Sequence, residues 1–184
     1  MLSDKIWVTK KARIYAERRL RRKAFFSEML MVFYSALLVI LSIWNLTHPN
    51  KGLDMLLVSG AIVVLVTTVF LSSQRFAERA LSMRSCYIRL DGLYSKVKRA
   101  EEEKDFKILT HYESEYSGIL DNVENHTEYD YLCLRYSLRN NQETTLPKFR
   151  IVDYVVFFMH KGLRFLFIVL CVILPIAVPI LWSR

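Results

Sequence analysis

Three long runs of apolar residues in this chain contain no charged side chain. They cover Met29–Leu46, Met55–Ser73 and Phe165–Ser183, and each is 18 or 19 residues long. A helix rises about 1.5 Å per residue, so each run spans roughly 27–28 Å, close to the hydrocarbon thickness of a thin bilayer. The pattern predicts three transmembrane helices. Turn-forming residues at 47–52 join the first two as a tight hairpin.

Between the second and third runs, apolar residues recur at alternating spacings of four and three, which is a heptad pattern. It predicts that the second helix continues into a cytosolic arm. A second periodic segment from Leu109 to Val123 predicts an antiparallel partner, with a turn near 98–105 and Asp105 as its N-cap. We expect this seam, together with the small-residue faces of the first two spans, to join copies of the chain into a homo-oligomer. The positions of the seam are Phe76, Ala80, Met83, Tyr87, Leu90, Tyr94 and Val97.

The remaining segments complete an all-α membrane protein in four parts. A further short helix is expected within 131–138, and an interfacial helix over 151–160 before the third span enters at 161–164. The expected organisation is a basic cytosolic arm helix at 1–24, a transmembrane hairpin at 25–73, a cytosolic helical hairpin and loop at 74–150, and the interfacial helix with the third span at 151–184.

Charge placement sets the expected orientation. Nine Lys or Arg precede the first run, only Lys51 lies between the first two runs, fifteen lie in 74–164, and only Arg184 follows the third run. Because cytoplasmic segments carry the excess of positive charge, the N-terminus and central segment are expected in the cytosol and the C-terminus in the periplasm of a bacterial inner membrane.

The basic arm has two interpretations. It can fix topology by contacting lipid headgroups, or it can provide a surface for a nucleotide or nucleic acid. The residues that would do so are Arg13, Arg18, Arg19, Arg21, Arg22 and Lys23.

The spans carry small polar residues but no charge, which argues against a proton relay or an ion-coupled transporter. These residues either allow close helix packing or line a weakly polar pore when several chains assemble. They are Ser35, Ser42, Ser59, Gly60, Thr67 and Thr68.

The sequence contains no recognisable catalytic pattern. Its four histidines are not spaced as metal ligands, and there is no phosphate-binding glycine loop or nucleophile signature. We therefore expect a protein that is not an enzyme and that needs no cofactor or metal.

Four local patterns resemble the SLATT family of small bacterial membrane proteins. They are the arm at 12–20, the two-span hairpin, Leu90–Tyr94 on the helix leaving the second span, and Tyr116–Leu120 followed by Glu124–His126 and Asp130-Tyr131. The third span is similar to that of a subgroup with a C-terminal extension, some of whose members resemble partners of defence-associated reverse transcriptases.

The resemblance implies an effector of anti-phage abortive infection. A sensor partner, either a reverse transcriptase or a nucleotide-signalling protein, would trigger assembly or opening, and the membrane would be permeabilised. Two alternatives stay open: a non-conducting tether that recruits a cytosolic partner, and a membrane-anchored nucleic-acid or nucleotide-binding module that uses the basic arm.

Overall fold

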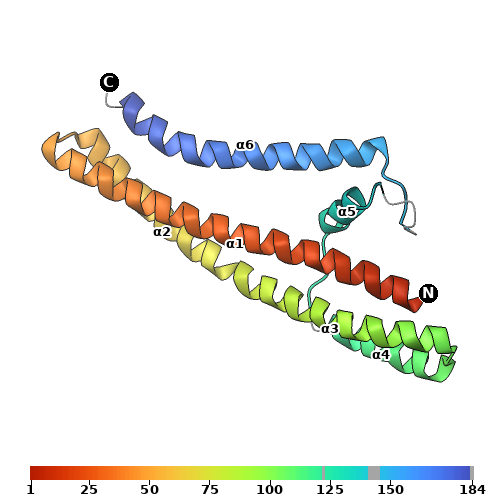
Figure 1. Cartoon of the computed structure of the whole chain (residues 1–184). Helices are drawn as coiled ribbons and strands as arrows, with labels where there is room; N and C mark the ends of the chain where they lie inside the picture. The colour runs from red at the N-terminus through yellow and green to blue at the C-terminus, as the bar shows by residue number, and fades with distance from the viewer. Residues whose placement is uncertain (122, 141–145, 183–184) are drawn as a thin grey trace. The chain divides into compact units, whose positions relative to one another are not determined.

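The computed structural model describes residues 1–121, 123–140 and 146–182, and every element within them is a helix (Figure 1). The all-α prediction is therefore confirmed. The helices are α1 (Leu2–Thr47), α2 (Lys51–Ser73), α3 (Phe76–Glu103), α4 (Phe106–Asp121), α5 (Glu128–Ser137) and α6 (Ile151–Trp182). Most of the loop predicted after α5 lies outside the described residues.

The chain divides into two compact units. Residues 1–22 and 76–157 form one, here called the helical unit, and residues 23–75 and 158–184 form the other, here called the apolar unit. The predicted basic helix is confirmed as the first part of α1, which continues without a break into the first apolar run. The division at residue 22 falls close to the expected end of the arm at residue 24.

Three helices of the chain are long and apolar enough to cross a membrane, and their apolar parts lie mostly in the apolar unit. Large apolar side chains of α2 such as Val58, Leu65 and Val69 are each 64% exposed. A protein folded in water does not leave a surface of this kind uncovered, whereas lipid covers it without cost. The three predicted spans are thus confirmed as apolar helices of the right length.

The turn between α1 and α2 is fixed by side-chain amides. Asn50 Oδ1 accepts hydrogen bonds from the Gly52 and Leu53 backbone N–H groups, at 2.9 and 3.4 Å, and so caps α2. Asn45 Oδ1 accepts from the Asn50 N–H at 3.1 Å, and the Asn45 amide also donates to Asp54. These bonds satisfy backbone groups that a helix end leaves open, which is how so short a turn reverses the chain.

The helical unit is built on the antiparallel pair α3 and α4 (Figure 1). Lys104 takes a left-handed backbone conformation, with φ 56°, at the turn between them. Asp105 Oδ1 then accepts from the N–H groups of Lys107 and Ile108, both at 3.2 Å. The predicted turn and its Asp105 cap are both confirmed.

The core of the helical unit shows what the heptad seam does. Leu90 and Val97 are fully buried in one apolar cluster that joins α3 to Ile6 of α1 and to Ile119 of α4. Ala80 and Met83 are buried in a second cluster, against Ala16 and Leu20 of α1.

Most of the seam is therefore covered within a single chain: four of its residues are buried, Phe76 and Tyr94 pack partly buried against the same clusters, and Tyr87 is half-buried. The prediction that it joins two copies is corrected for Ala80, Met83, Leu90 and Val97, because these side chains already pack against α1 and α4. The heptad pattern identified a packing face correctly, but the partner of that face is the chain's own N-terminal helix. Association of several chains by another surface remains a prediction.

Two further expectations are corrected in detail. The arm does not continue unbroken from the second span, because α2 ends at Ser73 and Arg75 takes φ 48° before α3 begins at Phe76. The expected interfacial helix at 151–160 is not a separate element, because α6 runs from Ile151 to Trp182 as one helix. The short helix expected within 131–138 is present as α5.

Candidate functional site

The arginines of the basic arm do not form one common surface. Arg13 is fully buried, Arg19 is mostly buried, and Arg18, Arg21 and Arg22 are exposed. The buried members face the α3–α4 hairpin and α5, and they form a charged cluster inside the helical unit. Lys23 is exposed and belongs to the apolar unit.

Arg13 is the centre of this cluster. Its Nη1 donates to the backbone carbonyl of Glu124 at 2.8 Å and lies 3.8 Å from the sulfur of Met83. Its Nε is buried and has no hydrogen-bond partner in the part of the chain that the structure describes. A guanidinium held this way bears a desolvation cost, because a buried charge is stabilised only when it is well paired.

Asp130 is the best-satisfied member of the cluster. Its carboxylate is 1% exposed. Arg19 donates to it through Nε and Nη2, at 2.9 and 3.0 Å, and Thr127 donates through its backbone N–H and its hydroxyl, at 3.0 and 2.8 Å. The planar fork of arginine matches a carboxylate in this two-bond arrangement. The start of α5 is thereby tied to α1.

Further contacts bind α1 to the other helices of the unit. Lys10 Nζ lies 2.6 Å from Asp91 and 4.9 Å from the centre of the Tyr94 ring. The hydroxyls of Thr9 and Tyr116 are 2.8 Å apart. Three of the stretches that carry the family resemblance, at 12–20, 90–94 and 116–131, thus meet around the first half of α1, although they are distant in sequence.

Glu124 ties α3 to the segment after α4. Arg79 donates to both of its carboxylate oxygens, at 2.9 and 3.0 Å, while the Glu124 carbonyl receives Arg13. Two helices therefore hold one residue of the connection between α4 and α5. The sequence places Glu124 and Asp130 in stretches that resemble the family, but it predicts no contact for either residue.

His126 lies beside Arg13 in the same connection. It is half-buried, and its Nδ1 is buried with no partner in the described residues. Burial, with the neighbouring Arg13 guanidinium adding to it, lowers the pKa of the His126 imidazole below its ordinary 6.5, while Asp130 acts in the opposite direction. The folded unit therefore disfavours the protonated form of the ring.

This lowered pKa predicts a loss of stability on mild acidification. As the pH drops through about 6.5, the unfolded chain takes up a proton on His126 more readily than the folded chain does, so the free energy of unfolding falls. His126→Gln should remove part of that slope, measured by hydrogen exchange of α4 and α5. His111→Gln, at an exposed position of α4, is the matched control. Equal slopes in all three proteins would contradict a lowered pKa of His126.

The small polar residues of the spans are mostly engaged with their own helices. The hydroxyls of Ser42, Ser59 and Thr68 each donate to the carbonyl four residues earlier, at 2.7 Å. A side chain added at Gly60 would meet Leu38 Cδ2 at 3.3 Å, so Gly60 permits close approach of α1 and α2. Ser35 and Thr67 are exposed.

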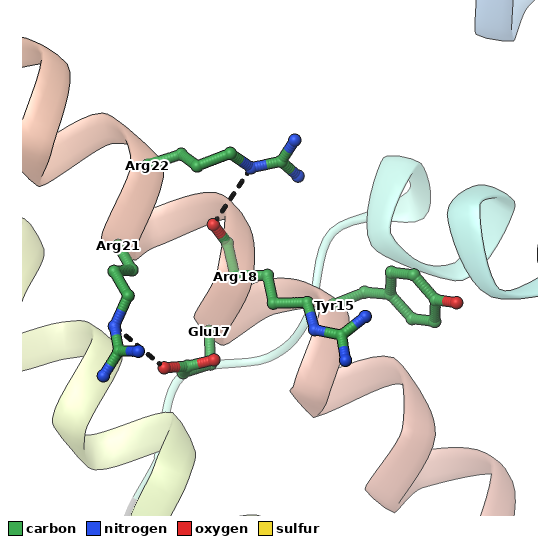
Figure 2. A pocket seen from close by; sticks show the side chains of 5 residues that line it. All are labelled: Tyr15, Glu17, Arg18, Arg21 and Arg22. Atoms are coloured by element: carbon green, nitrogen blue, oxygen red, sulfur yellow. Dashed lines mark hydrogen bonds and ion pairs between the residues drawn. The ribbon is translucent and has the colours of Figure 1, made fainter.

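A shallow depression lies on the exposed side of α1 in the helical unit. Its volume is about 460 Å³, and it is lined by Tyr15, Glu17, Arg18, Arg21 and Arg22 (Figure 2). Arg21 is paired with Glu17 at 3.4 Å. The structure contains no group of three or more His, Cys, Asp or Glu, within the residues described, that could hold a metal ion.

The three uncovered apolar helices and the polar helical unit define the class of an integral membrane protein with a folded extramembrane part. More particularly, the chain belongs to family 5 of the SMODS and SLOG-associating 2TM effector domains (SLATT), which matches residues 1–182. It is thus a membrane effector of the kind found in anti-phage defence systems. The match includes α6, so a third apolar helix accompanies the two that the family name counts. Comparison with curated proteins and with solved structures found no match.

Proposed function

We propose that the protein permeabilises the bacterial inner membrane when a partner signals infection. The family assignment over residues 1–182 carries this proposal. The three apolar helices supply the membrane part, and the charged cluster on α1 supplies a folded extramembrane part that a partner can act on. In the proposed orientation the N-terminus and the helical unit are cytosolic and the C-terminus is periplasmic.

A conducting path requires several copies of the chain. A bundle of three closely packed helices would leave too little space for water, so a water-filled path needs helices from different chains. The surface available for such assembly is on the spans, since most of the heptad seam is covered within the chain. We therefore assign the homo-oligomer contact to the apolar unit, including the small residues of α1 and α2.

The signal would come from a sensor partner, either a nucleotide-signalling protein or a reverse transcriptase. The proposal assigns no catalysis and no cofactor to this chain. Its helical unit would receive the signal, and its spans would carry out the response.

The proposal is tested in cells that express the chain with its neighbouring genes. Membrane potential and dye entry are measured in these cells before and after phage challenge. We expect rapid depolarisation after challenge. Gly60→Leu should slow depolarisation by about 5- to 150-fold, because overpacking a close helix contact costs roughly 1–3 kcal/mol. Ala61→Leu, at an exposed neighbouring position, is the matched control and should leave it unchanged.

A tether that recruits a cytosolic partner is the second candidate. It is favoured by the hydroxyls of Ser42, Ser59 and Thr68, which are satisfied by their own helices and offer little to a pore. A full membrane potential during a working defence response would overturn the pore proposal and support the tether.

A further inference from the structure

In the part of α1 that belongs to the helical unit, Arg18 and Arg22 differ from the other arginines in their contacts. Arg19 and Arg21 pair with Asp130 and Glu17, and Arg13 donates to a carbonyl. In the chain outside 122, 141–145 and 183–184, neither Arg18 nor Arg22 forms a salt bridge with a carboxylate. Two exposed guanidinium groups are therefore left with most of their donors directed to solvent.

Contacts within α1 hold the Arg18 and Arg22 side chains in place. Arg22 Nε donates to the Arg18 carbonyl at 3.2 Å, and the Arg18 guanidinium carbon lies 5.7 Å from the centre of the Tyr15 ring. Figure 2 shows Tyr15, Arg18 and Arg22 projecting to one side of α1, away from the Glu17–Arg21 pair. Residues three and four apart share a helix face, so both guanidinium groups can reach one ligand.

The chemistry of this face fits a phosphate. A guanidinium presents its N–H groups as a fixed fork that matches the oxygens of a phosphate group, and the Tyr15 ring restricts the motion of one fork. The paired Arg21 leaves Glu17 neutralised, so the carboxylate lining the depression does not repel an anion.

The position along α1 selects the source of that phosphate. Phe25 and Phe26, three and four residues beyond Arg22, are 58% and 43% exposed, and the uncharged run begins at Met29. Less than two helical turns thus separate Arg22 from the first residues suited to the hydrocarbon core, and that is where the headgroup layer of a bilayer lies.

We propose that Arg18 and Arg22 bind the phosphate of an anionic phospholipid headgroup, with Tyr15 holding Arg18 in place. The site depends on membrane insertion of the spans, and it does not depend on whether the chain permeabilises the membrane. It also differs from the buried half of the basic arm, which holds the helical unit together and is not accessible to lipid.

The test measures lipid retention by the full chain in neutral maltoside micelles, using native mass spectrometry. Phosphatidylglycerol and phosphatidylcholine are titrated against the native chain, the double variant Arg18→Gln with Arg22→Gln, and a charge-matched control, Arg89→Gln with Lys98→Gln, at exposed positions of α3. We expect the site variant to lose affinity for phosphatidylglycerol about 30-fold, while the control keeps it.

Additional arms separate charge from geometry and lipid from other phosphates. The double variant Arg18→Lys with Arg22→Lys keeps the charge but loses the planar guanidinium geometry. Its affinity for phosphatidylglycerol should fall between that of the native chain and that of the Gln variant. Equal phosphatidylglycerol affinity in the site and control variants would overturn the proposal. If inorganic phosphate or an oligonucleotide bound at Arg18 and Arg22 more tightly than the lipid, the assignment of the ligand as a lipid headgroup would be wrong. Retained helix content by circular dichroism shows that each variant is folded.

Discussion

Replacing Asp130 by alanine should destabilise the helical unit by about 3–5 kcal/mol, because it leaves the Arg19 guanidinium in a mostly buried position without its carboxylate. The substitution also removes the acceptor for the Thr127 N–H and hydroxyl at the start of α5. The expected result is a loss of protection against hydrogen exchange, concentrated in α5 and the connection before it. The spans should keep their protection, since they belong to the other unit.

Hydrogen exchange of the full chain in micelles measures this effect helix by helix. Glu128→Ala is the matched control, because Glu128 also lies in the first turn of α5 but is exposed. Its loss should cost less than about 1 kcal/mol, from the helix dipole alone. Similar exchange in the two variants would mean that the Arg19–Asp130 pair does not hold α5 to α1.

Leu90→Asp is the second substitution with a large expected effect. Leu90 is fully buried between α3, α1 and α4, and a carboxylate placed there would have no partner. We expect a loss of more than about 4 kcal/mol, which would unfold the helical unit. Circular dichroism and protease sensitivity of the purified chain measure the outcome.

Ile88→Asp is the control for Leu90→Asp, two residues away on the same helix and 55% exposed. It should change stability by about 0.5 kcal/mol or less. The comparison also separates packing within one chain from packing between copies. If Leu90→Asp left a folded monomer but abolished an oligomer, the seam would act between copies after all.

The elements of this protein were largely predictable, because each depends on local pattern. Three uncharged runs gave the spans, the alternating four-and-three spacing gave α3 and α4, and an aspartate after a charged turn gave the cap of α4. The partner of the seam was not predictable in this way. Periodicity shows that a face is apolar, but not which of several apolar faces covers it.

The charged cluster was missed for a related reason. Arg13 was grouped with the other arginines of the arm by charge, although it lies seven residues after Ile6 and seven before Leu20, both buried. That spacing places Arg13 in the apolar stripe of α1, and it is the signal that could have identified it as buried. Thr127 followed by Asp130 three residues later likewise matches the capping-box pattern, which predicts the start of a helix. The pairing of Arg19 with Asp130 had no local signal, since 111 residues separate them.

The Arg19–Asp130 pair also constrains how this sequence can change over generations. Lysine at position 19 would keep the charge but could not reproduce the two parallel bonds, and a neutral residue at position 130 would leave a buried cation. Either change alone should therefore destabilise the helical unit, whereas simultaneous apolar replacement of both residues should cost much less. We therefore expect substitutions at positions 19 and 130 to occur together or not at all.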